Sequence, residues 1–367
     1  MPPRLRSLDA FRGLTVAAML LVNNPGSWSY VYPPLAHAEW HGWTPTDLIF
    51  PFFLFIAGVA LAFSLRAREE QGAGRRVVLR RILRRGLVII LAGLLLNGFP
   101  FYHLDTLRWP GVLQRIGLVY LVAAPAWLLL PAWGVALLSG TLLLGYWALM
   151  TLVPVPGYGA GVLEPVGNLA QFVDARLLAG HTWKPDWDPE GLLSTLPAIA
   201  TCLLGALTGQ WLRRQAPSGR VPWRLALAGA LAVAVGLAWA LVFPINKSLW
   251  TSSYVVFTAG MGAVALATCT WLVDVLGITS WAAPFHWFGR NPMIAFLGSG
   301  AMARLMGSII TVPIDGARAP LQRVIYDQAF ASWLAPRNAS LLYALTFVAC
   351  WAAILFALDR RKVYFKV

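Results

Sequence analysis

Long apolar stretches, separated by shorter segments rich in polar residues, proline and glycine, run through almost the whole chain. A helix needs about 20 mostly apolar residues to cross a bilayer, and most of these stretches approach that length. The pattern therefore predicts a single all-α domain over residues 1–367, a polytopic membrane bundle of about ten transmembrane helices. The predicted spans are 11–23, 46–65, 78–97, 111–130, 132–152, 192–212, 223–243, 252–273, 284–306 and 340–358.

The composition also indicates a membrane protein. Of the 367 residues, 58% are apolar and 12% are charged, whereas soluble domains carry about 25% charged residues. These values exclude a soluble enzyme, a disordered chain and a disulfide scaffold. Cys202, Cys269 and Cys350 lie in apolar runs without metal-site spacing, and we expect them to be small buried hydrophobes. The first run lacks a small-residue cleavage site, so we expect it to remain as a membrane helix.

The net charge of +14 is concentrated on one side of the predicted bundle. Cytoplasmic loops of membrane proteins carry an excess of Lys and Arg. If the N-terminus is cytoplasmic, most of the 29 basic residues fall on that side, and both termini are cytoplasmic. The charge is then explained by contact with membrane lipid, and no nucleic-acid partner is expected. These basic segments are Arg4–Arg12, Arg66–Arg85, Arg213–Arg224, Arg290 and Arg360–Lys366.

The opposite, extracytoplasmic side receives the longer predicted loops, 24–46, 153–191 and 307–339. In the third loop, residues 319–334 are expected to form an amphipathic or re-entrant helix. The first loop holds the richest set of chemical groups, His37, Glu39, His41 and Asp47. Ionisable groups near membrane depth are functional candidates by default.

A histidine near neutral pH can act as a general base when a carboxylate orients it. His37 and Asp47 have this potential, although a solvated loop with freely titrating histidines explains the same residues. Asp47 precedes a strongly apolar run and is expected to cap that helix. His37 and His41 are four residues apart, but no third ligand is evident, so no metal site is expected.

Eight arginines lie between Arg66 and Arg85 in the predicted first cytoplasmic loop. Contact with anionic lipid on the cytoplasmic side, which anchors the positive-inside orientation, is sufficient to explain them. Some of them also have the geometry to bind the phosphates of a cytosolic ligand. Further polar groups fall within or beside the predicted spans, where they either pair between helices or line a cavity across the bilayer: Asp9 and Arg12, Asn97, Gln114 and Arg115, Asn246 and Lys247, and Arg290 and Asn291.

Several segments together resemble the heparan-α-glucosaminide N-acetyltransferase family of multi-pass membrane acetyltransferases. The His37–Pro51 block and the Pro-Gly-Val-Leu-Gln-Arg block are its most specific features. The matching segments follow the family order over nearly the whole chain: Arg4–Gly13, Leu21–Gly26, His37–Pro51, Leu107–Gly117, Asp188–Gly191, Pro244–Tyr254 and Gly289–Pro292.

The resemblance implies transfer of an acetyl group from cytosolic acetyl-CoA to a sugar amine across the membrane, without a metal. His37 corresponds to the family's active-site histidine, and Asn23, or alternatively Asn24, to its catalytic asparagine; Asp47 completes the expected catalytic set. His37 would act as a general base or be acetylated itself. The expected donor-binding residues are Arg12, Arg80, Arg81, Arg84, Gln114 and Arg115. The expected acceptor-binding residues are Glu39, Asp188, Glu190, Asn246 and Lys247.

The chain lacks the long N-terminal extension of the lysosomal animal members, and its composition is rich in Ala and Arg. These features favour a bacterial protein of the inner (cytoplasmic) membrane, whose acceptor is an extracytoplasmic amino sugar or glycan hydroxyl rather than heparan. A homodimer is compatible with the sequence. The competing function is a transporter or flippase of a sugar or lipid-linked substrate without acyl chemistry, which also explains polar groups in the helices.

Overall fold

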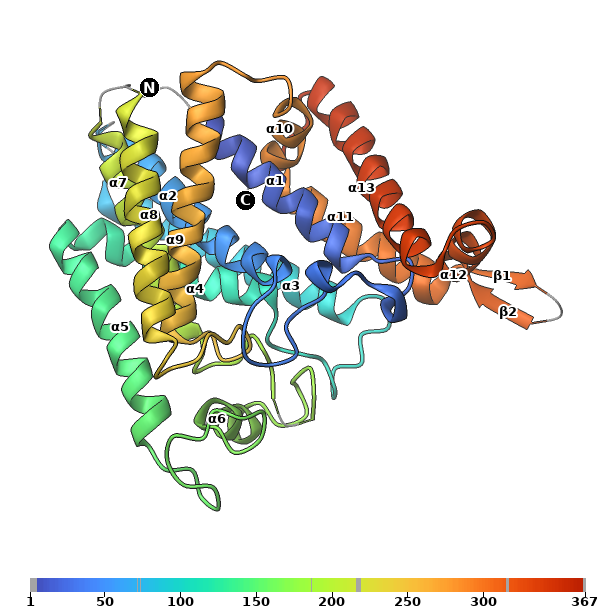
Figure 1. The fold of residues 1–367 in the computed structure, drawn as a ribbon, viewed down its shortest axis with the longest axis horizontal. Coiled ribbons are helices and arrows are strands. Elements are labelled where there is room, and N and C mark those ends of the chain that lie inside the picture. The colour runs from blue at the N-terminus through green and yellow to red at the C-terminus, as the bar shows by residue number, and fades with distance from the viewer. Residues whose placement is uncertain are drawn as a thin grey trace.

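A computed structural model describes residues 5–70, 72, 74–185, 187–215, 219–314 and 317–365. Arg4, Lys366 and the side chains of Arg66 and Arg68, all part of the predicted basic side, lie outside the described residues. The described part is helical with one short hairpin, so the predicted all-α bundle is confirmed (Figure 1). Its helices are α1 (Arg6–Asn23), α2 (Ile49–Glu70), α3 (Arg75–Gly98), α4 (Val112–Leu129), α5 (Ala132–Leu152), α6 (Leu169–Leu177), α7 (Thr195–Arg213), α8 (Arg220–Trp239), α9 (Ser252–Cys269), α10 (Ala283–Arg290), α11 (Pro292–Arg304), α12 (Leu321–Tyr326) and α13 (Pro336–Arg360).

Nine of the ten predicted spans each correspond to one long helix, and the span 284–306 is divided between α10 and α11. Within the described residues, eight of these helices are long and apolar enough to cross a membrane. The other two are α1 and α3, whose charged residues lower their hydropathy: α1 holds Arg6, Asp9 and Arg12, and α3 begins with an arginine-rich stretch. Both pack along the other helices, so the bundle retains ten long helices in its described part.

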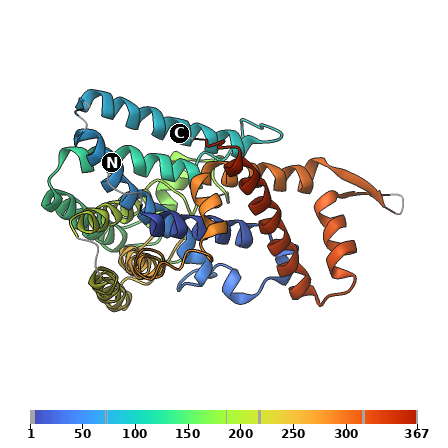
Figure 2. The same ribbon diagram turned by 90° about the horizontal axis from the view of Figure 1, so that it is seen from above.

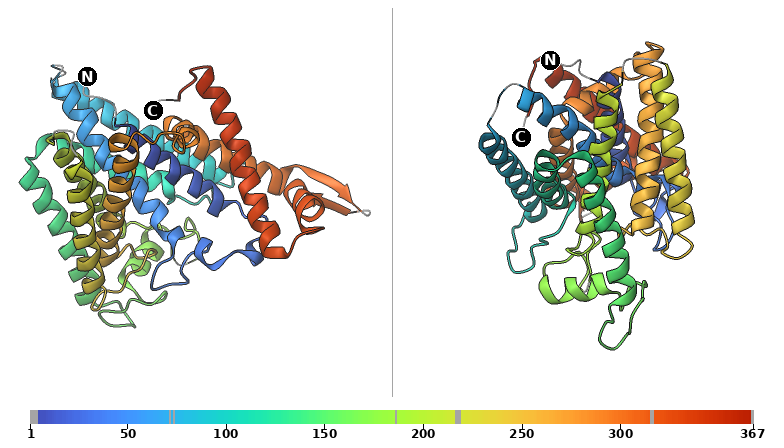
Figure 3. Two further views of the ribbon diagram at one scale, coloured as in Figure 1. Left: turned by 45° about the horizontal axis from the view of Figure 1, so that its top comes forward. Right: turned by 90° about the vertical axis from the view of Figure 1, so that its left-hand side faces the viewer.

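The helices form two groups that meet at α1 and α2. In Figure 1 the helices α5, α7, α8 and α9 stand together, and α10, α11 and α13 lie on the other side of α1. The two termini lie at the same end of the bundle, and α6 with its long loops lies at the opposite end (Figure 3). This arrangement agrees with an even number of predicted spans.

Tight helix packing holds the first group together. The helices α2 and α7 approach so closely that a Cβ atom on Gly58 would lie 1.8 Å from the Cys202 carbonyl oxygen. A Cβ on Gly205 would lie 2.1 Å from the Phe55 carbonyl oxygen. Small residues allow this approach, which is how membrane helices gain packing energy without a hydrophobic effect between them.

The structure corrects two predictions about element boundaries. The predicted span 284–306 is two helices, because the chain turns at Asn291 and α11 restarts at Pro292, a residue suited to a first helical turn. Asp47 is not the N-cap residue: Thr44 holds that position before a 3₁₀ turn (Pro45–Leu48), and Asp47 completes a capping box by accepting a hydrogen bond from the Thr44 backbone N–H at 3.0 Å.

The third long loop also differs from its prediction. Two short strands, β1 (Thr311–Ile314) and β2 (Ala317–Pro320), pair antiparallel as a hairpin that projects from the side of the bundle (Figure 2). The predicted helix over 319–334 is limited to α12 and a π turn (Asp327–Ala331).

Cys202 and Cys269 are buried as predicted, but Cys350 is exposed on α13. Its predicted burial is wrong because that face of α13 points away from the bundle.

Candidate active site

Three adjoining cavities occupy the interior. The histidine cavity, about 630 Å³, contains His37; the arginine cavity, about 450 Å³, contains Arg12; and the side cavity, about 430 Å³, contains Arg304. They meet at a common wall because three residues line all of them: Met19, Val112 and Phe296.

His37 and Asp47 form the predicted pair at the wall of the histidine cavity. The His37 Nδ1 and Asp47 Oδ1 atoms are 2.6 Å apart, and the Asp47 side chain is 1% exposed. Asp47 Oδ2 accepts hydrogen bonds from the backbone N–H groups of Ala38 and Thr44, each at 3.0 Å. An ionised carboxylate only accepts, so Nδ1 is the nitrogen that carries a proton in this contact. In the neutral imidazole Nε2 then keeps its lone pair, which is the tautomer that a general base requires.

Lys247 lies beside this pair and adds a cation to it. Its Nζ lies 3.2 Å from His37 Nε2, 3.0 Å from Nδ1 and 3.6 Å from Asp47 Oδ1. Burial lowers the pKa of Lys247, and the charge of Asp47 opposes that effect only in part. The side chain comes from the turn between α8 and α9, which the buried Asn246 stabilises by accepting from the Leu249 backbone at 2.8 Å. A cation thus lies at the reactive edge of the imidazole.

Contacts between distant segments hold the His37 loop in place. The Trp40 indole donates to the Leu163 carbonyl oxygen at 2.8 Å, and the Gly42 N–H donates to the Ile245 carbonyl oxygen at 2.8 Å. The Tyr254 hydroxyl donates to the Asp47 carbonyl oxygen at 2.5 Å. His41 faces the Asn246 amide at 3.3 Å and does not line the histidine cavity.

The mouth of the histidine cavity is lined by aromatic side chains and by both acidic and basic groups, Lys184 among the latter. Trp40 and Trp187 meet edge to face with ring centres 5.5 Å apart, and Trp183 meets Trp187 at 6.1 Å. Glu39 and Glu190 lie on the same lining. Rings offer flat faces to sugars, and carboxylates attract an ammonium group, so the mouth suits a glycan that carries an amine.

An ion cluster fixes the wall between the histidine and side cavities. Arg108 donates from Nε and Nη2 to the two carboxylate oxygens of Asp188, at 2.7 and 2.6 Å, and also to Glu190. Burial tends to lower the pKa of Arg108, but its hydrogen bonds to Asp188 and Glu190 and their negative charges outweigh burial and raise that pKa. Asp188 is fully buried, which gives it a structural role in shaping the cavity.

We expect Arg108→Met to lower the free energy of unfolding by about 3–5 kcal/mol, because it leaves the buried Asp188 charge without a partner. Unfolding of the detergent-solubilised protein, followed by tryptophan fluorescence, measures this change. Arg176→Met is the control, since Arg176 is exposed and contacts only the Phe172 ring in the described contacts; its cost should be at most about 1 kcal/mol. Equal costs for the two variants would contradict the role of the cluster.

The arginine cavity lies at the end of the bundle that holds both termini. Arg12, Arg85 and Arg290 line it. The predicted pair within α1 forms, with Arg12 Nη1 3.2 Å from Asp9 Oδ1. The other three arginines predicted to bind the donor, Arg80, Arg81 and Arg84, are exposed along α3 and do not line this cavity.

The predicted residues Gln114 and Arg115 have different surroundings. Gln114 lines the side cavity. Arg115 is fully buried, donates to Ser194 Oγ and to the Gly191 carbonyl oxygen at 3.0 Å, and lies over the Trp250 ring. It lines none of the three cavities, so its contacts are those of a helix-packing residue.

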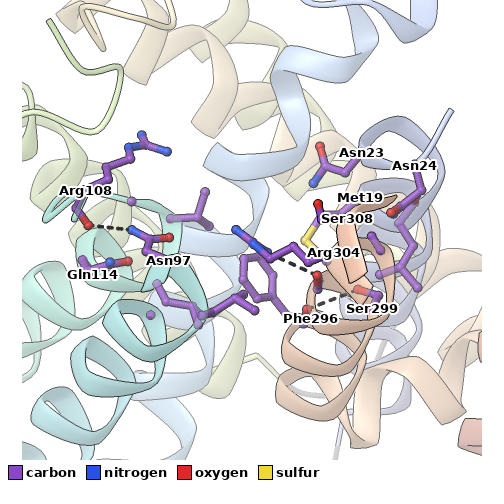
Figure 4. A pocket seen from close by; sticks show the side chains of 18 of the residues that line it. Met19, Asn23, Asn24, Asn97, Arg108, Gln114, Phe296, Ser299, Arg304 and Ser308 are labelled. Atoms are coloured by element: carbon purple, nitrogen blue, oxygen red, sulfur yellow. Dashed lines mark hydrogen bonds between the residues drawn. The ribbon is translucent and has the colours of Figure 1, made fainter. Parts of the chain in front are cut away.

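The two candidate asparagines are distinguished by their contacts. Asn24 donates to the Leu20 carbonyl oxygen at 2.8 Å, which ties its side chain to α1. Asn23, at the last position of α1, is exposed and lines both the histidine and the side cavity (Figure 4). Asn23 is therefore the asparagine with an amide available to a ligand beside His37.

Sequence reasoning did not single out Arg304 or the tryptophans of the cavity mouth. The signal for Arg304 was present, because it is a lone cation within an apolar run. The tryptophans were hidden among 18, many of them near predicted span ends. Across the part of the chain that the structure describes, no group of three or more His, Cys, Asp or Glu side chains is arranged to hold a metal ion.

Comparison with known proteins identifies the family of the chain. Residues 4–243 match the family model described as heparan-alpha-glucosaminide N-acetyltransferase, catalytic. The chain belongs to this family. It is 28% identical to the human heparan-alpha-glucosaminide N-acetyltransferase and 27% identical to the mouse protein, over 100% and 99% of its own length. It spans 60% of the length of each of these two relatives. The match to the family model includes His37 and Asp47. Lys247 and Arg304 lie beyond residue 243, where only the alignments with the two relatives extend.

Proposed function

We propose that this protein is a multi-pass membrane acetyltransferase that moves the acetyl group of acetyl-CoA to an amino sugar or glycan hydroxyl on the extracytoplasmic side. The observation that carries the proposal is the meeting of the arginine and histidine cavities at Met19, Val112 and Phe296. A donor held by phosphate-binding arginines can thereby present its acetyl group to His37 through the protein. The family membership supports the reaction type.

The donor phosphates bind at the cytoplasmic end. Arg12, Arg85 and Arg290 line the cavity there, and guanidinium groups suit phosphate geometry. The exposed arginines of α3 raise the local concentration of the anionic donor. The pantetheine arm then extends along the apolar interior, across part of a bilayer core of about 30 Å.

The chemistry centres on His37 Nε2. The acceptor nitrogen or oxygen attacks the thioester carbonyl carbon while Nε2 takes its proton, and the C–S bond breaks when the tetrahedral intermediate collapses. The CoA thiolate leaves and receives the proton from the imidazolium. Asn23 and Lys247 line the same cavity and stabilise the oxyanion. Alternatively, Nε2 attacks first and passes on an acetyl group in a ping-pong sequence.

The acceptor binds at the opposite mouth, where the tryptophans supply ring faces. Glu39 attracts its amine, whereas Glu190 lines the same mouth with its carboxylate already paired with Arg108. Asp188 and Asn246 do not contact the acceptor in this scheme. Asp188 holds Arg108 in place, and Asn246 stabilises the turn that carries Lys247.

A transporter without chemistry also needs cavities, but it needs no buried carboxylate that fixes the tautomer of an exposed histidine. The proposed location is the bacterial inner membrane.

Sealed, oriented vesicles test the two-sided reaction. We expect acetylated glucosamine only when acetyl-CoA is on the side of the chain termini and the sugar is on the side of the His37 loop. The physical reason is that the phosphates cannot pass the apolar wall shared by the cavities. Mass spectrometry of the product measures transfer, and permeabilised vesicles are the control. Equal yield with both substrates on the termini side would refute the two-sided arrangement.

A further inference from the structure

The side cavity carries polar groups that the proposed acetyl transfer leaves without a role. It lies between α1 and α11 on one side and α3 and α4 on the other (Figure 4). Arg304 and Ser308 approach it from the α11 segment, and Asn97 and Gln114 from α3 and α4. Such a lining at membrane depth is costly unless it binds something polar.

Arg304 is the charge at the centre of this lining. It lies within the apolar segment Pro292–Ile309 and is half-buried. Its guanidinium donates to the Gly300 carbonyl oxygen at 3.2 Å, one turn earlier in its own helix. Among the described residues, no carboxylate forms an ion pair with it. A cation placed in this way is suited to an anion that arrives as a ligand.

Gln114 provides a second, independent indication. Its side chain is buried at 4% exposure, yet its Nε2 has no hydrogen-bond partner among the described residues. The side chain is confined, because a Cβ on Gly93 would lie 2.4 Å from its Oε1 and a Cβ on Gly111 would lie 2.7 Å from that atom. A buried donor without a partner is destabilising unless a ligand completes its hydrogen bond.

The surroundings of the cavity indicate how a ligand enters. On the α11 side, Ser308 of the lining is exposed and is followed by the exposed Ile309 and Ile310, at the end of the apolar, membrane-length segment Pro292–Ile309. The side cavity also continues into the histidine cavity, since Asn23, Trp28 and Arg108 line both. A ligand here contacts lipid at one end and His37 at the other.

We propose that the side cavity binds the phosphate of an amphiphilic, lipid-anchored acceptor, whose sugar then occupies the histidine cavity. Arg304 holds the phosphate as a charge-assisted partner, and the Gln114 amide faces the same cavity, whereas the Asn97 amide nitrogen already donates to the Arg108 and Pro110 carbonyl oxygens. This inference rests on the proposed acetyl transfer and narrows its acceptor from any glycan to a phosphate-bearing glycolipid. A soluble sugar would need no cationic site between membrane helices.

Binding of dodecyl phosphate tests the site without any acetyl transfer. Isothermal titration of the full chain in micelles of the uncharged detergent dodecyl maltoside measures Kd. We expect Arg304→Gln to weaken binding tenfold or more, Arg304→Lys to retain most of it, and inorganic phosphate to bind far more weakly. Arg323→Gln is the matched control, because Arg323 is exposed, pairs with Asp327 and does not line the cavity.

Three results would overturn the proposal. The first is a Kd for dodecyl phosphate in Arg304→Gln equal to that of the wild type, and the second is a wild-type Kd for inorganic phosphate equal to that for dodecyl phosphate. The third is displacement of dodecyl phosphate by CoA alone, which would place dodecyl phosphate in the donor site.

A second assay compares acetylation of glucosamine with that of a glucosamine joined to a dodecyl chain through phosphate. Wild type should favour the lipid-linked probe, and Arg304→Gln should lose that preference while retaining its activity on glucosamine. Failure to acetylate either probe would count against the proposed function, whereas the binding result would still decide the phosphate site.

Discussion

His37→Ala should lower kcat for acetyl transfer by about 10²–10⁴-fold, the contribution of a positioned general base, with little change in acetyl-CoA binding. The imidazole is fixed by the buried Asp47 through a 2.6 Å hydrogen bond and opens onto the histidine cavity. The donor phosphates, in contrast, are assigned to the arginine cavity. Steady-state kinetics with glucosamine, together with titration of CoA, separates the two effects. If His37 is the acetylated group, the same variant also loses exchange of acetyl between CoA molecules in the absence of acceptor.

His41→Ala is the matched control for this experiment. His41 is a histidine of the same loop, but it contacts the Asn246 amide and lies 3.9 Å from Glu164 rather than in the histidine cavity. We expect it to retain kcat within about threefold, since surface substitutions usually change stability by no more than about 0.5 kcal/mol. Near-normal turnover in His37→Ala, or an equal loss in both variants, would contradict the catalytic assignment.

The fold was largely predictable because the bilayer imposes a strong length and polarity requirement on each helix. Boundaries failed where local chemistry interrupts an apolar run. Asn291 and Pro292 split one predicted span, although the hydropathy of residues 284–306 is nearly continuous. In the third long loop, a hairpin replaces the first residues of the predicted helix, since β pairing of 311–314 with 317–320 depends on contacts that helical periodicity does not report.

The candidate site was predictable only where its partners are close in sequence. His37 and Asp47 are ten residues apart and fall in one loop, so their pairing followed from the pattern. Lys247 approaches His37 across a separation of 210 residues, which only the packing of the α8–α9 turn against that loop brings about. Similarly, eight arginines shared one predicted loop, but the tertiary structure alone shows that Arg85 of this group faces the arginine cavity.

Lys247→Met should reduce kcat by about 10²–10³-fold, comparable with the loss of one oxyanion-stabilising donor. The ammonium lies within 3.2 Å of the base nitrogen and 3.6 Å of Asp47, so its removal takes away the cation nearest to the reacting atoms. Lys247→Arg keeps the positive charge and should recover part of the activity. Circular dichroism and melting temperature, measured on both variants, identify any loss that comes from misfolding.

The pH dependence of these variants tests the electrostatic role directly. Because burial lowers the pKa of Lys247 below its ordinary value of 10.5, wild-type kcat should fall at alkaline pH as the ammonium loses its proton, with a midpoint below 10.5. An arginine does not deprotonate in this range, so Lys247→Arg should lack that alkaline fall. Lys247→Met should also lack it, but at a uniformly low rate. An alkaline fall that persists unchanged in Lys247→Arg would assign the titration to another group and remove Lys247 from the chemistry.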